Sequence, residues 1–168
     1  MFESRFVYLA SLTAVLTVCF FFLQYSRVAE IWGINPNILL VFFLTLLFLR
    51  FAAFLFSVSA LVFLIFSIFF FHFWFFEAIA LVAVSIMAGF TRKALTGDRV
   101  LDFFTLVLCS TIIFYAVLYG LDIFSFSVLF IILKEALYNI LVGCVALLFI
   151  FAPVFYDSTA TKYRRGTR

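Results

Sequence analysis

The chain has 168 residues, of which 68% are hydrophobic and 11% are charged, whereas a soluble domain carries about 25% charged residues. A water-soluble fold of this length could not hide so much apolar surface, so lipid must be the solvent for most of the chain. The net charge of +3 is concentrated at the C-terminal tail and does not indicate nucleic-acid binding. The composition therefore predicts an all-α integral membrane protein.

The first apolar run, from Phe6 to Gln24, could be taken for a cleaved signal peptide because a charge precedes it. A signal peptide has an apolar region of about 7 to 15 residues and a small-residue cleavage site. This run is longer and no such site follows it, so we expect an uncleaved first membrane span.

Apolar runs and their interruptions predict six spans. They extend over about Phe6 to Gln24, Asn35 to Leu49, Phe51 to Phe71, Trp74 to Phe90, Val100 to Tyr119 and Leu133 to Phe155. Most approach the roughly 20 residues needed to cross a hydrocarbon core, and together they predict one domain over residues 1–168.

The second span has a clear start and an unclear end. The sequence INPN offers Asn35 as a helix N-cap and Pro36 at the first helical position, followed by Asn37. From Ile38 to Phe71 the only charged residue is Arg50 and there is no Gly or Pro, so a five-span protein remains an alternative.

Basic residues predict the orientation. With six spans and a cytoplasmic N-terminus, every Lys and Arg except Arg27 and Lys134 falls on the cytoplasmic side, whereas the acidic residues divide evenly. A bias carried by Lys and Arg is the positive-inside pattern. It favours a multi-pass protein of the cytoplasmic membrane with both termini inside.

Two connecting segments have distinct compositions. The cytoplasmic turn TGDR is flanked by Arg92, Lys93 and Arg99, which either set the topology alone or also meet anionic lipid headgroups or a cytoplasmic partner. On the outer side, residues 121–132 (LDIFSFSVLFII) are too apolar for a free loop. We expect them to lie in the membrane interface or against the bundle.

No motif for catalysis, a metal or a cofactor is present. The sole histidine, His72, stands near the outer boundary beside Trp74, where an interfacial imidazole is the simpler interpretation than a ligand or proton relay. Cys19, Cys109 and Cys144 are isolated and have no metal-binding or disulfide spacing. The sequence therefore predicts a non-enzymatic protein that needs no cofactor.

Small and polar residues mark the expected helix contacts, because lipid supplies little hydrophobic drive between helices. The first span carries Ala10, Ala14 and Thr17, and the third carries Ser57, Ala60 and Ser67.

In the last span, Glu135, Asn139, Gly143 and Ala146 fall on one helical face. If this span begins at Leu133, Glu135 lies near the helix N-terminus, where a negative charge is favourable. This face meets either a neighbouring helix of the same bundle or a partner subunit or ligand.

Two segments carry a resemblance to a known family: INPNILLVFFLTLLFL at the second span and EALYNILVGCVALLFIFAPVF in the last. Here the chain resembles the MreD rod shape-determining family of bacteria. The third span departs from that family, since it has Ser57 and Ser67 but no acidic residue. The resemblance implies a scaffold subunit of the cell-elongation complex that couples peptidoglycan synthesis to the MreB filament. Its partners would be an MreC-like scaffold, MreB, the RodA glycosyltransferase and a class B penicillin-binding transpeptidase.

A second resemblance belongs to another functional class. The substrate-binding subunits of energy-coupling-factor vitamin transporters are also six-span proteins of similar size and look related in fold to MreD. They carry an AxxxA-type motif in the first span, to which ASLTA at Ala10 to Ala14 is similar. A third alternative is a membrane bundle that assembles with other partners.

Overall fold

The computed structural model describes residues 2–49, 52–70, 75–91, 97–120 and 125–165, with side chains described for all of these except 2–5, 99 and 149–165. Within these ranges the chain forms six α-helices and no β-strand. The helices are α1 (Phe2–Tyr25), α2 (Ile38–Leu47), α3 (Ala52–Phe70), α4 (Phe75–Thr91), α5 (Arg99–Tyr119) and α6 (Phe126–Arg165).

Long apolar segments make this a multi-pass membrane protein. Among the described residues, four helical segments are long and apolar enough to cross a membrane: Phe6–Tyr25, Ala52–Phe70, Val100–Tyr119 and Phe126–Leu148. Helices α2 and α4 are apolar but shorter. At about 1.5 Å per residue, the 10 residues of α2 extend through roughly half of a hydrocarbon core of about 30 Å.

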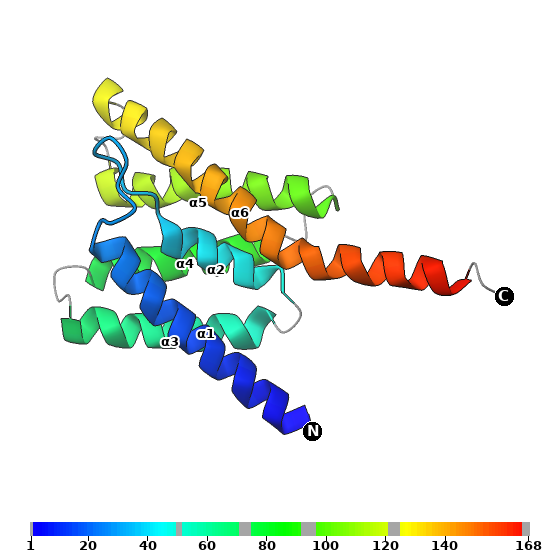
Figure 1. Cartoon of the computed structure of the whole chain (residues 1–168). Coiled ribbons are helices and arrows are strands. Elements are labelled where there is room, and N and C mark those ends of the chain that lie inside the picture. The colour runs from blue at the N-terminus through cyan, green and yellow to red at the C-terminus, as the bar shows by residue number, and fades with distance from the viewer. Residues whose placement is uncertain (1, 50–51, 71–74, 92–96, 121–124, 166–168) are drawn as a thin grey trace.

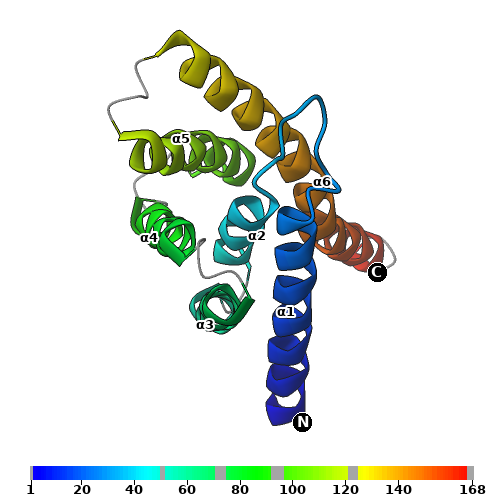
Figure 2. The same cartoon turned by 90° about the vertical axis from the view of Figure 1, so that its left-hand side faces the viewer.

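The short helix α2 is the centre of the bundle. It packs against each of the other five helices, and Figure 2 shows them arranged around it. Leu39, Leu40, Phe43 and Leu44 of α2 are completely buried. The ring of Phe43 meets that of Phe63 on α3 edge to face, at a centroid distance of 5.6 Å. A uniformly apolar helix is expected in this position because every side of it faces protein.

The helices run alternately in opposite directions, so the bundle has two different ends (Figure 1). The terminal end holds the N- and C-termini. The opposite end, called here the loop end, holds the loop of residues 26–37, the last turns of α1, α3 and α5 and the first turns of α2, α4 and α6. This arrangement agrees with termini on one side of the membrane, and their cytoplasmic location stays a prediction.

The start of α2 was predicted two residues too early. The N-cap is Asn37, whose Oδ1 accepts a hydrogen bond from the backbone N–H of Leu40 at 3.0 Å. Asn35 instead donates its amide N–H to the carbonyl of Gln24 at 2.6 Å. Pro36 precedes the cap and is buried, so it is not the first helical residue.

The start of the last helix was also predicted wrongly. Helix α6 begins at Phe126, so residues 126–132 are its first two turns rather than a separate interfacial segment. Residues 121–124 lie outside the described part of the chain. Glu135 is consequently the tenth residue of α6, too far from its N-terminus for the helix dipole to stabilise a charge, since that effect is confined to the first turn.

Helices α1 and α3 are joined by a buried hydrogen bond between Thr17 Oγ and Ser59 Oγ at 2.8 Å. Thr17 donates its own proton to the carbonyl of Thr13 at 2.7 Å, which leaves Ser59 as the donor between the helices. The expectation that Ser57 marks a helix contact was wrong, because Ser57 is exposed and donates its hydroxyl proton to the carbonyl of Ala53 within α3.

Candidate functional site

Asn139 links three helices at the centre of the bundle. Its side chain is completely buried. Its Oδ1 accepts a hydrogen bond from the backbone N–H of Asn37 at 2.7 Å, and its Nδ2 donates to Thr111 Oγ1 on α5 at 3.0 Å. The side chain thus ties α6 to the start of α2 and to the middle of α5.

The other residues of the predicted face on α6 lie in three different surroundings. Gly143 faces α5, since a Cβ built on it would lie 3.0 Å from Cε1 of Phe103. Ala146 lines an apolar groove beside α1 and α2, and Glu135 lines a polar pocket at the loop end. The face therefore runs from the polar pocket, through a packed centre, to the apolar groove.

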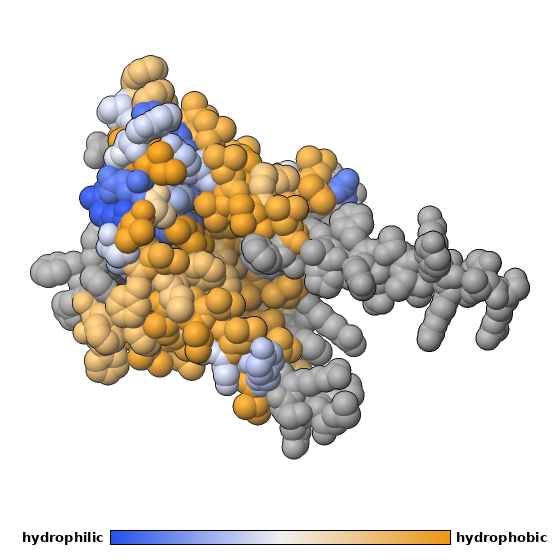
Figure 3. Space-filling view, viewed as in Figure 1, coloured by the Kyte–Doolittle hydropathy of each residue, from blue (hydrophilic) through white to orange (hydrophobic). Residues whose placement is uncertain are grey.

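The polar pocket has a volume of about 570 Å³. Its wall combines the last residues of α1, the loop of residues 26–37, the first turn of α4, the last turns of α5 and the third turn of α6. In Figure 3 the hydrophilic surface gathers at this loop end, whereas most of the coloured surface elsewhere is hydrophobic. A volume of this size lies within the range of small-molecule sites, about 300–1,000 Å³.

Two carboxylates face this pocket. Glu77 of α4 and Glu135 of α6 both line it. The Glu135 side chain is only 8% exposed. On each carboxylate, Oε2 is buried and has no hydrogen-bond partner among the described residues. A buried carboxylate charge is costly unless it is paired, so among the described residues these two acids lack the partner that would stabilise their charged forms.

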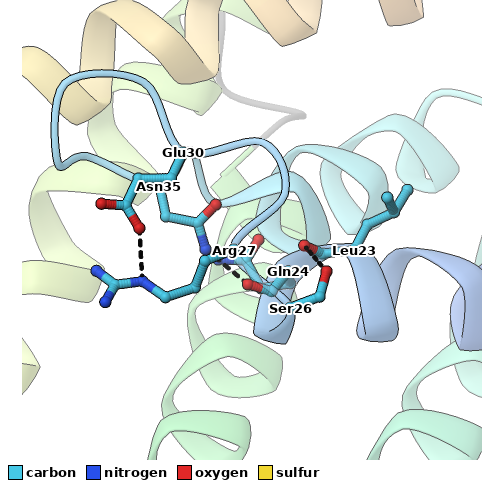
Figure 4. Close-up of polar contacts among 6 residues, drawn as sticks. All are labelled: Leu23, Gln24, Ser26, Arg27, Glu30 and Asn35. Carbon is cyan, nitrogen blue, oxygen red and sulfur yellow. Dashed lines mark hydrogen bonds and ion pairs between the residues drawn. The ribbon is translucent and has the colours of Figure 1, made fainter.

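Polar contacts join residues of the 26–37 loop, part of which lines the pocket, to one another and to the end of α1 (Figure 4). Arg27 Nε lies 2.8 Å from Glu30 Oε2 in an ion pair, and Gln24 Oε1 accepts a hydrogen bond from the backbone N–H of Ile38 at 2.8 Å. Arg27 and Trp32 have positive φ angles of 56° and 53°. Such angles are uncommon outside glycine and occur often at binding sites, where surrounding contacts hold them.

The aromatic part of the wall comes mainly from α1 and α5. Tyr25, Tyr115 and Tyr119 line the pocket, and the rings of Tyr115 and Tyr119 are stacked at a centroid distance of 5.9 Å. Tyrosine presents both an apolar face and a hydroxyl, so these rings suit a ligand with a flat or apolar body.

The apolar groove lies between α1, α2 and α6 and has a volume of about 600 Å³. Figure 1 shows α2 between the other two helices. Leu12, Leu16 and Val145 line the groove and are 42%, 37% and 54% exposed. In a membrane this groove opens sideways toward lipid or a neighbouring protein.

Several residues singled out from the sequence cannot be placed at either site. Arg92, Lys93 and His72 lie outside the described residues, and Arg99 is the first residue of α5 but its side chain is not described. Lys134 extends over the ring of Phe130, with Nζ at 4.4 Å from the centroid.

Sequence patterns did not predict the composition of the polar pocket. Gln24, Tyr25, Tyr115 and Tyr119 stand at the ends of apolar helices, where polar and aromatic residues are ordinary membrane-interface features. The one available signal was that they share the predicted outer side with Glu77 and Glu135.

Comparison with protein-family models finds no match, and comparisons with curated proteins and with solved structures find none either.

Proposed function

We propose that this protein is a non-enzymatic scaffold subunit of the bacterial cell-elongation complex, as the resemblance of its second and last spans to the MreD family suggests. The observation that carries the proposal is the apolar groove between α1, α2 and α6, with a volume of about 600 Å³. In this role the groove receives a transmembrane helix of an MreC-like partner. The protein would reside in the bacterial cytoplasmic membrane.

The lining of the groove supports a helix as its occupant. Besides large aliphatic side chains, it includes Thr13, Thr45 and Ala146. Small and hydroxyl-bearing residues allow close approach of helices and are enriched at helix contacts in membranes. The basic residues predicted from the sequence to be cytoplasmic, Arg92, Lys93 and Arg99, would provide positive charge for contact with MreB or anionic lipid.

Cross-linking tests the groove directly. In a background with Cys19, Cys109 and Cys144 replaced, a cysteine at Val145 should cross-link to an MreC-like partner in cells. The matched control is a cysteine at Leu148, which is 71% exposed on the same helix but does not line the groove. Equal cross-linking at both positions, or at neither, would contradict the proposal.

Blocking the groove should also affect cell shape. Ala146→Phe fills the groove and should abolish co-purification with the MreC-like partner and turn rod-shaped cells round, whereas Leu148→Phe should change neither. Cells that remain rod-shaped when the protein is depleted would refute the scaffold role.

The polar pocket favours a second candidate function, that of an energy-coupling-factor substrate-binding subunit. Its volume of about 570 Å³ and its two carboxylates at the predicted outer end provide a place for a small solute. Retention of a vitamin on the purified protein, with co-purification of transport ATPases, would favour this candidate. A gene beside those of MreB and MreC would favour the scaffold.

A further inference from the structure

We infer that the polar pocket at the loop end binds an organic cation, namely a protonated amine or amidine carried on a flat or apolar body. The inference is independent of the scaffold proposal, because no residue lines both the polar pocket and the apolar groove.

The positive charge of the ligand is inferred from the two carboxylates. Glu77 and Glu135 face the same space, and each has a buried Oε2 without a hydrogen-bond partner among the described residues. Glu135 is more than nine-tenths buried. A cationic group between them would supply the charge-assisted hydrogen bonds that both carboxylates lack.

The bases described near the pocket are already engaged. Arg27 lines the pocket, but its Nε is paired with Glu30 at 2.8 Å. Lys134 directly precedes Glu135 in sequence, yet its Nζ lies over the Phe130 ring. Among the residues that the structure describes, neither cation forms an ion pair with Glu77 or Glu135.

The size of the pocket and its ligands indicate an organic cation rather than a metal ion. The described residues contain no group of three or more His, Cys, Asp or Glu side chains that could hold a metal. A volume of about 570 Å³ also greatly exceeds the space of a single ion.

The aromatic wall defines the body of the ligand. The stacked rings of Tyr115 and Tyr119 line the pocket beside Tyr25. Aromatic faces attract cations within about 6 Å of the ring centre, and they also pack against flat groups. An amine on an aromatic or similarly flat body therefore offers both a positive charge for the carboxylates and a flat group for the tyrosine rings.

Binding to the full-length protein in lipid nanodiscs tests the inference. The probes are two matched pairs, tyramine with its neutral analogue tyrosol and benzamidine with neutral benzamide, measured by thermal unfolding and by titration calorimetry. We expect at least one cation to bind and to raise the unfolding midpoint, while its neutral partner binds at least about tenfold more weakly.

Acid-to-amide variants locate the site. Glu135→Gln and Glu77→Gln should each weaken binding of the cation at least about tenfold, since a charge-assisted hydrogen bond is lost. Asp98→Asn is the matched control at the terminal end, where Asp98 caps α5, and it should leave binding unchanged.

The stability of unliganded Glu135→Gln provides a second measurement. Because the substitution removes an acid whose charged form is costly to bury unpaired, it should not lower the unfolding midpoint without ligand, while it weakens binding of the cation. Four results would overturn the inference: no cation binds the folded protein, neutral analogues bind equally well, Glu135→Gln retains full affinity, or Ca²⁺ and Mg²⁺ alone stabilise the wild type through these carboxylates.

Discussion

Asn139 shows how much structure one amide can organise in an apolar interior. It accepts from the backbone of Asn37 and donates to Thr111, at 2.7 and 3.0 Å. Lipid and packed hydrocarbon side chains cannot replace either hydrogen bond. Asn139 therefore stands in an otherwise apolar part of α6 because the buried backbone N–H of Asn37 needs an acceptor.

Asn139→Leu should destabilise the bundle by about 1–3 kcal/mol, because the N–H of Asn37 is left buried without an acceptor. Unfolding of the purified protein by sodium dodecyl sulfate in mixed micelles measures this change. Thr111→Val removes the bond from Asn139 to α5 and the bond from the Thr111 hydroxyl to the carbonyl of Val107, but it leaves the acceptor of the Asn37 N–H in place and should cost less. A fully stable Asn139→Leu protein would show that these bonds do not hold the bundle together.

The two glycines of the helical interior should respond differently to alanine. At Gly89, a Cβ would meet Leu47 at an ordinary 3.5 Å, whereas at Gly143 it would meet Phe103 at 3.0 Å. Gly89→Ala should therefore gain up to about 1 kcal/mol from helix propensity, and Gly143→Ala should gain less or lose stability. The same unfolding titration compares them.

A Phe103→Leu background tests whether close contact with the Phe103 ring causes the difference, because this substitution removes the ring that lies next to Gly143. The difference between the two alanine variants should shrink there. Equal gains at both positions in the wild-type background would contradict close packing at Gly143.

At the level of elements, the most informative helix is α2. It is too short to span the membrane by itself, yet it contacts all the other helices. The side chains of α2 pack against protein rather than against lipid. Truncating one of them therefore leaves a cavity that lipid acyl chains cannot fill.

Leu44→Ala in α2 should cost about 2 kcal/mol or more, because Leu44 is completely buried and truncation leaves a cavity. Leu61→Ala is the matched control on α3, where the leucine is 62% exposed and lipid can fill the space. Thermal unfolding in nanodiscs checks both. Equal losses would mean that α2 is not the core of the bundle in a membrane.

The limits of α3, α4 and α5 could be predicted within one residue, because charges, glycine or aromatic clusters interrupt the apolar runs there. The starts of α2 and α6 could not. Both asparagines of INPN have cap chemistry, and the bond from Asn35 to Gln24 decides which one caps. The first two turns of α6 have an apolar composition that also suits a segment lying in the membrane interface. No local sequence signal shows that these residues continue into the helix.

The candidate site was harder to predict for a different reason. Glu77 and Glu135 belong to separate helices, and nothing in their spacing indicates that they face one pocket. The sequence predicted that Asn139 belongs to a contact face of the last span. It could not distinguish a contact with a neighbouring helix from a contact with a partner subunit or ligand.

At the scale of the whole molecule, the alternating helices separate two surfaces, with both termini at one end and the loop of residues 26–37 at the other (Figure 1). The distribution of Lys and Arg along the sequence predicts that the end with the termini faces the cytoplasm.

Cysteine labelling in intact cells should confirm this orientation. In a cysteine-free background, Trp32→Cys should react with an impermeant reagent from outside, because Trp32 is 88% exposed in the loop. A reporter fused after Arg168 should be active only in the cytoplasm. A C-terminal reporter that is reached from outside would refute the orientation with both termini inside.

The bond between Asn37 and Asn139 joins residues 102 positions apart in the chain. A ribosome adds about 5–20 residues per second, so α2 is made roughly 5 to 20 seconds before the side chain that satisfies its first turn. During synthesis the N–H of Asn37 at the start of α2 therefore has no Asn139 acceptor until α6 has been made. The N–H of Asn37 obtains its acceptor only when α6 is in place, so we expect insertion of the last helix to complete the bundle.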